Sequence, residues 1–504
     1  MLISYQRKNM KKQKNFLPIS ALILSFILCA AVFFVGYTKF LGLETEIDAN
    51  YPAFLNQFPQ IFNFINIKTW ISGKYPTFPD KITEIFIGIL YLIVNILYVL
   101  WLFQAQRNYS YKGLKFFDLV KLCFPFLALA FISYPLGNDI YLYLQYGLMA
   151  LNNYNPFLLR AGGFSSELYE FIRWYQTSTY GPVSLTFFVI SAAFVPVSKI
   201  LAIYLFKGFC LVAHLLNGYL VFRLLKKYPY SEIVTLAYLC NPLILFEQVG
   251  SAHVDVFVCT TFLFLIFCFK CKHYLVGVLT IWLGFMAKTL PILWLPLGTA
   301  FLIQQRRWYS LIFAVIGSLA IVGLLTITVL PTKEAWWSLL NPGVSDTLGP
   351  LADTMGSFHR ILATYLRYWP NLTSQFKMDI IAKFKLFTYA IFGAYYLVTL
   401  IQIPLRRRYS EDNLGLDIGW VSLLLFVLAT PWLMPWYAFT LLPATALNID
   451  DRRFALTSLA FSMSSASHYA LLSTGVFHSW FVVGFPILIL GLDLIIPRSQ
   501  RYVV

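Results

Sequence analysis

Charged side chains are scarce in this sequence, because Asp, Glu, Lys and Arg together make up only 12% of the 504 residues. Soluble domains contain about 25%. Hydrophobic residues make up 59%, against about 45–50% in soluble domains. A soluble fold of this length needs far more polar surface than this composition offers. The shortage of charge therefore excludes soluble nucleic-acid enzymes and disordered hub proteins.

Two further absences narrow the class of protein. The seven cysteines show no regular spacing, and their single Cys-x-x-Cys pair, Cys268 and Cys271, has no second pair to complete a zinc site, so neither a disulfide framework nor a zinc site is indicated. The chain also lacks the Gly-x-Gly-x-x-Gly turn of a strand–helix–strand nucleotide site. A soluble nucleotide-sugar domain is thereby excluded, and nucleic acid is not an expected partner.

The residues that are present indicate a helical membrane protein. Mean hydropathy is +0.69, and there are 47 Phe, 32 Tyr and 13 Trp. A span needs about 20 apolar residues, or fewer inside a bundle. We predict one all-α transmembrane domain over residues 1–504, with about 14 spans in a range of 13–15. The predicted spans are 17–36, 84–104, 117–134, 199–223, 231–248, 254–270, 274–290, 291–305, 309–330, 384–404, 414–431, 435–449, 454–472 and 477–496.

The excess of basic residues, 38 Lys and Arg against 22 Asp and Glu, gives the predicted orientation. Basic residues gather in the loops around Arg107, Arg223, Arg306, Arg406 and Arg452, and such loops are usually cytoplasmic. Both termini are then cytoplasmic, and the first span at 17–36 is not a cleaved signal. Three aromatic-rich polar stretches, 37–83, 135–182 and 332–383, are expected on the outer face as interfacial helices.

The apolar segment 183–197 does not fit this alternation. Counting it as a span places either the basic patch at 223–227 or the loop of Asp139 on the wrong side. We predict a re-entrant or short paired element, which is tolerated where protein surrounds it. The alternative is a fifteenth span with the patch at 223–227 outside.

Acids near membrane depth are costly and usually functional. Asn138 is a good N-cap for a helix beginning at Asp139, and Asp139, Tyr143 and Tyr146 share one face of that helix. The opposite face carries apolar side chains that an interfacial helix would place in lipid, namely Ile140, Leu144, Leu148 and Leu151. The helix thus turns a carboxylate among tyrosines toward a cavity. Alternatively, Asp139 only favours the helix dipole.

A second polar group lies between two apolar runs. One run ends at Glu247, and His253 and Asp255 begin the next helix after a Gly/Ser turn. A helix N-terminus suits an anion such as a phosphate, and His253 adds a donor. A metal held by Glu247, His253 and Asp255 is an alternative without defining spacing, and a satisfied polar turn is another.

Further along, Lys288 interrupts an apolar run just before Pro291 and is predicted to be the only cation within the membrane. It either holds a phosphate leaving group or snorkels to the interface. Trp436 and Tyr437 join two spans on the same face as either an interfacial belt or a stacking wall for a sugar ring. Tyr180 precedes Gly181-Pro182, and this motif on its own predicts only a loop.

Together these segments resemble the integral-membrane glycosyltransferases of the GT-C class, in particular the bacterial polyprenol-phosphate-mannose-dependent α-1,6-mannosyltransferases. The resemblance covers about residues 117–440. It rests on Asn-Asp-x-Tyr-x-Tyr at 138–143, Asn155-Pro156, Tyr180-Gly181-Pro182, Asn241-Pro242, Glu247 with His253-x-Asp255, Lys288-x-x-Pro291 and Trp436-Tyr437.

The resemblance implies a polyprenyl-phosphate-sugar donor, a glycan or lipid-linked acceptor, transfer on the outer face of a bacterial plasma membrane, and Asp139 as the catalytic acid. Mannose is the favoured sugar, although related enzymes use glucose or arabinose. Where that class usually has a pair of acids, this sequence has one, so a divalent metal is left open and no other cofactor is expected. The catalytic module is expected at 117–305, followed by a C-terminal helical part at 306–504.

General chemistry gives roles to these residues independently. An acceptor hydroxyl needs a carboxylate base, which Asp139 supplies. The departing phosphate needs cations or helix N-termini, for which Lys288, His253 and Arg360 are the candidates. The remaining substrate contacts are expected from Tyr143, Tyr146, Glu247, Asp255, Tyr180, Trp436 and Tyr437.

Two other classes of protein fit the composition. A transporter or lipid-glycan flippase uses intramembrane charges near mid-span and often contains internal repeats. Here the charges gather at span ends, and no repeat is evident. A non-catalytic scaffold leaves the acids and Lys288 without a purpose. The sequence therefore favours an enzyme.

Overall fold

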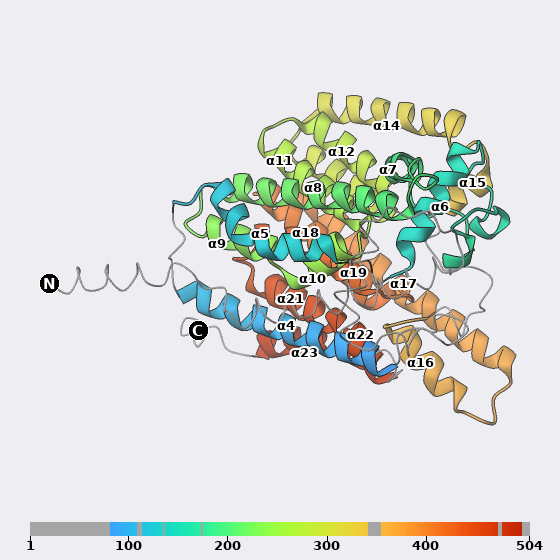
Figure 1. Ribbon diagram of the computed structural model, residues 1–504. Coiled ribbons are helices and arrows are strands. Elements are labelled where there is room, and N and C mark those ends of the chain that lie inside the picture. Colours follow the sequence, from blue (N-terminus) through green and yellow to red (C-terminus); the bar gives the residue numbers. More distant parts are fainter. Residues whose placement is uncertain are drawn as a thin grey trace.

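The computed structural model describes residues 81–107, 113–133, 135, 137–172, 175–340, 354–471 and 476–495 (Figure 1). These residues are helical and contain no β-strand, with two isolated bridges, Tyr180 to Lys288 and Met355 to Trp432. The predicted span at 17–36 and nearly all of the polar stretch 37–83 lie outside the described residues. The all-α class is confirmed.

The helices of the bundle follow the apolar runs of the sequence. Their bounds are α4 Lys81–Arg107, α5 Phe116–Ile132, α6 Asp139–Leu151, α7 Pro182–Ala192, α8 Lys199–Leu225, α9 Ser231–Leu239, α10 Pro242–Ile244, η5 Leu245–Gly250, α11 Asp255–Lys270, α12 Tyr274–Ala287, η6 Leu290–Leu293, α13 Trp294–Gln304, α14 Trp308–Thr328, α15 Lys333–Leu340, α16 Phe358–Arg367, α17 Ser374–Leu405, α18 Glu411–Leu424, η7 Leu425–Ala429, α19 Pro435–Phe439, α20 Leu442–Leu447, α21 Arg452–Ala466, α22 His468–Leu471 and α23 Val476–Ile495. Two short 3₁₀ turns, η3 Ala161–Gly163 and η4 Tyr169–Phe171, lie between α6 and α7.

Six helical segments of the described chain are long and apolar enough to cross a membrane, fewer than the predicted 14. Other predicted spans form shorter helices, such as α11 with 16 residues and α12 with 14. Helices buried among others need not each match the bilayer thickness. The six segments are 199–225, 231–250, 308–328, 374–405, 411–429 and 476–495. The chain is therefore an integral membrane protein.

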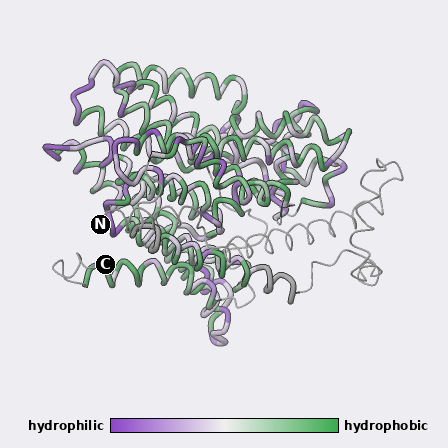
Figure 2. Tube along the Cα trace, turned by 60° about the vertical axis from the view of Figure 1, so that its left-hand side comes forward, coloured by the Kyte–Doolittle hydropathy of each residue, from purple (hydrophilic) through white to green (hydrophobic). Residues whose placement is uncertain are grey.

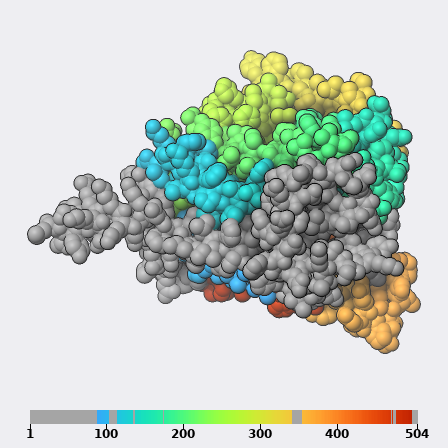
Figure 3. Space-filling model, viewed as in Figure 1, coloured from blue at the N-terminus to red at the C-terminus, as the bar shows by residue number. Residues whose placement is uncertain are grey.

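The core and the periphery of the bundle differ in burial. In the most apolar 18 residues of the segment from α9 to η5, 94% of the residues are buried, whereas the corresponding shares in α14 and α17 are 11% and 22%. α14 lies along one edge of the molecule, and the segment from α16 into α17 projects from the opposite corner (Figures 1 and 3). The exposed sides of α14 and α17 are rich in Leu, Ile and Phe, as lipid-facing helices are.

The turns that carry the basic residues meet at one end of the bundle. Lys270 at the end of α11 and Lys272 just after it form ion pairs with Asp412 and Glu411 at the start of α18. Gln304, at the end of α13, donates to the Arg406 carbonyl at 3.0 Å. Because α11 and α12 begin or end at this basic end, their other ends, at Asp255 and Ala287, lie at the opposite end. The hydropathy of the tube in Figure 2 follows the same division, with apolar helices between polar turns.

The helix that begins at Asp139 is confirmed, but its predicted placement in lipid is wrong. Ile140, Leu144 and Leu148 are all buried, and only Leu151 is exposed. α7 packs along α6, and a Cβ at Gly147 would lie 2.4 Å from the Phe188 carbonyl oxygen, so glycine allows this close contact. Protein rather than lipid therefore covers the leucine face. Asn138 precedes the helix without capping it, because its amide donates to the Phe171 carbonyl at 3.2 Å.

The segment at 183–197 contains α7, which has 11 residues. At about 1.5 Å per residue, such a helix is about half as long as a bilayer core is thick. α7 pairs with α6 and contacts α8 and α12. The prediction of a short paired element agrees with this arrangement.

Candidate functional site

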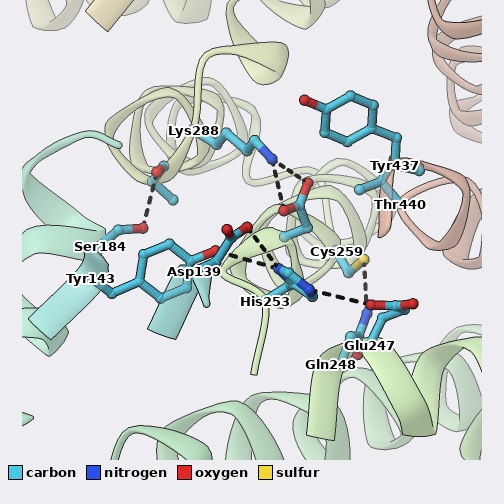
Figure 4. A network of polar contacts seen from close by, with 12 residues as sticks. Asp139, Tyr143, Ser184, Glu247, Gln248, His253, Cys259, Lys288, Tyr437 and Thr440 are labelled. Atoms are coloured by element: carbon cyan, nitrogen blue, oxygen red, sulfur yellow. Dashed lines mark hydrogen bonds and ion pairs between the residues drawn. The ribbon is translucent and has the colours of Figure 1, made fainter. Parts of the chain in front are cut away.

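A buried histidine lies between two carboxylates (Figure 4). It lies at the end of the bundle opposite the basic turns. His253 Nδ1 is 3.7 Å from Asp139 Oδ2, and His253 Nε2 is 3.3 Å from Glu247 Oε2. The His253 and Glu247 side chains are 1% and 0% exposed, and that of Asp139 is 14% exposed. The Asp139 carboxylate is thus the member of this chain of groups that a substrate can reach.

Local backbone structure brings Glu247 and His253 together. Asn241 caps the short helix α10, accepting from the Ile244 amide at 3.1 Å, and the chain then enters the π-helical turn η5. Turns of this type are rare in proteins, and where they occur they often lie at functional sites. Ala252 has φ +59°, and the His253 amide returns to donate to the Glu247 carbonyl at 3.0 Å. This reversal aims the imidazole at the Glu247 carboxylate.

Aromatic rings enclose the imidazole. The Trp436 indole stacks on the His253 ring, with centroids 3.8 Å apart and planes 20° apart. The Tyr143 hydroxyl lies 3.4 Å from His253 Nδ1, and the Tyr143 ring stacks on Phe188. Asp139 and Tyr143 of α6 therefore lie together with His253 and Trp436.

The Lys288 ammonium is held by a buried carboxylate. Lys288 Nζ donates to both Asp255 oxygens, at 2.7 and 2.8 Å. It also lies 4.8 Å from the Tyr437 ring centroid and 5.9 Å from that of Tyr180. The Lys288 side chain is 15% exposed and that of Asp255 is 3% exposed. Lys288 is therefore directed into the site rather than outward along lipid.

A close approach of two backbones joins Tyr180 to this wall. Tyr180 and Lys288 form an isolated antiparallel bridge, and the Ser184 hydroxyl donates to the Ala287 carbonyl at 2.9 Å. A Cβ at Gly181 would lie 2.3 Å from the Met286 carbonyl oxygen, so only glycine permits the contact. The Tyr-Gly-Pro motif thus docks the start of α7 against the end of α12.

Residues 71–304 match a family model described as "alpha-(1->6)-mannopyranosyltransferase, N-terminal domain". Through this domain, over somewhat less than half of its length, the chain is similar to the α-(1→6)-mannopyranosyltransferases. It is therefore a glycosyltransferase, and the alternatives of a transporter and a scaffold give way to an enzyme. The matched part holds Asp139, Glu247, His253, Asp255 and Lys288, whereas Trp436 and Tyr437 lie beyond it. No curated protein matches the chain.

Sequence reasoning missed one cation of the enzyme. Lys207 lies inside α8 with a fully buried side chain, so the prediction that Lys288 is the only intramembrane cation is wrong. The Lys207 ammonium donates to the Ala130 carbonyl at 3.3 Å, the Gly250 carbonyl at 2.7 Å and the Ser133 carbonyl. The position of this lysine in the middle of the apolar run 199–223 could have indicated a second intramembrane cation.

The charge state of His253 follows from its burial. Burial, followed by the positive charge of Lys288, lowers the pKa of His253 well below its usual range. The carboxylates of Asp139 and Glu247 act in the opposite direction. With burial as the largest cause, the imidazole is neutral at neutral pH, and its one N–H can face only one of the two carboxylates of the enzyme at a time.

Two predicted site residues lie apart from this cluster. The Tyr146 hydroxyl donates to the Gln176 and Thr177 carbonyls, at 3.0 and 3.1 Å, and so holds the loop before Tyr180. Arg360 is half-buried in the first turn of α16, and its guanidinium forms no ion pair with a carboxylate of the described chain. The segment before α16 is joined to that of Trp436 by the Met355 amide, which donates to the Pro431 carbonyl at 3.0 Å.

Within the described residues, no cluster of three His, Cys, Asp or Glu side chains has the arrangement of a metal site. Glu247 contacts His253, and Asp255 contacts Lys288, so the two metal candidates face different partners. A cation approaching Asp255 would meet the Lys288 ammonium. The arrangement favours hydrogen-bonding and acid–base chemistry by the side chains themselves.

Proposed function

We propose that the enzyme transfers mannose from a polyprenyl-phosphate-mannose donor to a glycan or glycolipid acceptor at the non-cytoplasmic end of the bundle, with Asp139 as general base. The observation that carries the proposal is the Asp139–His253–Glu247 chain beside the Lys288–Asp255 pair. It places one accessible carboxylate and one ammonium in the same enclosed site. The match to the mannopyranosyltransferase family model supports mannose and a mannosyl product.

Asp139 is suited to receive a proton. Asp139 is the first residue of α6, and its carboxylate is partly exposed. His253 Nδ1 lies 3.7 Å from Asp139 Oδ2, and His253 is in turn held by Glu247. With its single N–H on Nδ1, the neutral imidazole of His253 faces the Asp139 carboxylate as a donor. His253 and Glu247 therefore act as positioning residues that orient the Asp139 carboxylate, much as second-layer groups fix an active-site base.

The Lys288 side of the site is suited to the leaving group. When the acceptor oxygen bonds to C1 of mannose, the bond from C1 to the phosphate oxygen breaks, and the acceptor proton passes to Asp139. The departing polyprenyl phosphate gains negative charge, which a fixed ammonium stabilises more in the transition state than in the ground state. The Asp255 carboxylate holds Lys288 in place, while the Tyr437 and Tyr180 rings lie beside its ammonium. Arg360 is a further candidate cation for the donor phosphate.

The orientation in the membrane supports the outer face. Basic turns favour the cytoplasm, and the site lies at the opposite ends of the helices that those turns connect. The apolar exterior of the bundle would accommodate the polyprenyl chain beside the site. A donor that is itself a lipid reaches this site from within the bilayer.

The direct test is turnover by the purified full-length protein. Mannose transfer to a lipid-extract acceptor should occur with polyprenyl-phosphate-mannose and not with GDP-mannose, and free polyprenyl phosphate should accumulate in equal amount. Transfer from the nucleotide sugar alone would contradict the proposed donor. Transfer of glucose in place of mannose would contradict the proposed sugar.

The proposed sidedness has its own test. Cys271 is exposed at the basic end, and Ser165 is exposed in the loop after α6. A membrane-impermeant maleimide added to intact cells should label Ser165→Cys in a Cys271→Ser background. It should label wild-type Cys271 only after the membrane is opened. The reverse pattern would place the site on the cytoplasmic face.

A further inference from the structure

A cavity of about 470 Å³ lies at the basic end of the bundle, far along the helices from the site described above. It lies where α13 ends and α17 turns toward α18. Hydrogen bonds from Gln304 to the Arg406 carbonyl and from Gln305 to the Tyr409 carbonyl, at 3.0 and 2.7 Å, fix the two turns to each other. The lining residues are Gln304, Gln305, Arg306, Arg407, Arg408, Tyr409, Ser410 and Asn413, and they include no acid.

Within the described ranges, the three arginines of this cavity lack the carboxylate partners that several basic residues of the same end have. At the same end of the described chain, Lys270, Lys272 and Arg406 have carboxylate partners, as do Arg452 and Arg453, which share Asp493. The guanidinium groups of Arg306, Arg407 and Arg408 are exposed and form no such ion pair among the described residues. Three uncompensated positive charges therefore surround one hollow, together with the amides of Gln304, Gln305 and Asn413.

Lipid-facing helices border the cavity. α17 ends at Leu405, which is 74% exposed. α14 begins at Trp308 and Tyr309, which are 54% and 83% exposed. Exposed Trp and Tyr at a helix end are typical of the headgroup level of a bilayer. The cavity thus opens where a phospholipid headgroup lies, with apolar helix surfaces running away from it for the acyl chains.

We infer that the cavity lined by Arg306, Arg407 and Arg408 binds the phosphate headgroup of an anionic phospholipid. Guanidinium groups recognise phosphate by paired, charge-assisted hydrogen bonds, and basic pockets between membrane helices bind anionic headgroups. The bound lipid joins the α13–α14 turn to the α17–α18 turn and so stabilises the bundle at this end. This inference does not depend on the proposed function, because the cavity and the Asp139 cluster share no residue.

The test compares two charge-matched double variants of the full-length protein in detergent. Arg407→Gln/Arg408→Gln removes two charges from the cavity, whereas Lys226→Gln/Lys227→Gln removes two exposed charges from another turn of the same end. Native mass spectrometry counts bound phosphatidylglycerol and phosphatidylcholine, and thermal unfolding is followed with each lipid and with inorganic phosphate at equal concentration.

We expect phosphatidylglycerol to remain bound and to raise the unfolding temperature of the wild type, while phosphatidylcholine and inorganic phosphate do neither. The arginine variant should lose roughly 10- to 30-fold in phosphatidylglycerol affinity, and the lysine variant should bind as the wild type does. Equal losses in both variants would show general surface attraction and overturn the site. A full thermal shift with inorganic phosphate alone would overturn its assignment to a lipid.

Discussion

The Lys207 ammonium donates to the Gly250 carbonyl at 2.7 Å, so a cation inside α8 holds the end of the π-helical turn that carries Glu247. Its other acceptors, Ala130 and Ser133, lie at the end of α5, a few residues before Asp139. The carbonyl ends of two helices, which carry partial negative charge, thereby converge on one lysine. Lys207 thus ties together the two segments that supply Asp139 and His253.

Replacing Lys207 should damage catalysis through geometry. Lys207→Met removes the donor to these carbonyls, and a shift of about 1 Å between Asp139 and His253 costs on the order of 10²-fold in kcat. KM should change little, and Lys207→Arg should recover part of the loss because it can still donate. Steady-state kinetics with the donor measure both. Lys199→Met, at the half-buried start of the same helix, where Lys199 pairs with Glu167, is the control. A kcat no lower than that of the control would remove Lys207 from the positioning of the site.

Asp139→Asn should abolish transfer while leaving stability nearly unchanged. Loss of a general base costs about 10²–10⁴-fold in rate, whereas a first-turn acid contributes about 1 kcal/mol or less to stability. The matched control is Glu334→Gln, which removes an acid from the first turn of α15. Radiolabelled transfer and thermal unfolding give the two readouts. If the Asn variant kept more than about a tenth of the activity, Asp139 would not be the base.

Variants of the Lys288–Asp255 pair can distinguish a role of Lys288 in stability from a role in using the donor. Lys288→Met leaves the Asp255 carboxylate buried without its partner, at a cost of about 3–5 kcal/mol. Adding Asp255→Asn should restore most of the unfolding temperature but not the use of the donor. Lys288→Arg should retain part of both, since its charge remains but its geometry differs. Donor KM and kcat, measured in all three variants, decide the matter. Normal donor kinetics in the double variant would leave Lys288 a structural role only.

The lowered pKa of His253 predicts acid sensitivity. As the pH falls below about 6.5, the unfolded chain binds a proton at this histidine that the folded chain does not, so folding loses stability until the folded pKa is reached. Above that window both forms are neutral, and the stability is fully present. The unfolding temperature of His253→Gln should therefore fall less between pH 6.5 and 5 than that of the wild type. His273→Gln, at the basic end, is the control. A steeper fall in His253→Gln would show that the carboxylates hold an imidazolium.

The sequence by itself determined the class of protein and the order of its polar segments. Scarce charge and long apolar runs require lipid as the main solvent, so the all-α membrane bundle followed from composition. The turn at Gly181 and the start of α6 at Asp139 could also be predicted, because turn and helix-start signals depend only on residues that are close in the sequence. The number of membrane spans could not be predicted, because short buried helices and true membrane spans have the same hydropathy.

Tertiary structure alone decided which charges meet. Asp255 and Lys288 are 33 residues apart, and His253 stacks on Trp436 from the far half of the chain. Neither pairing leaves a periodic signal in the sequence. The leucines of α6 face protein rather than lipid because α7 folds back against them. Lys207 became informative only when the ends of α5 and η5 were found beside it. A buried charge is tolerated according to its partners in space, and distant segments supply those partners only once the bundle has packed.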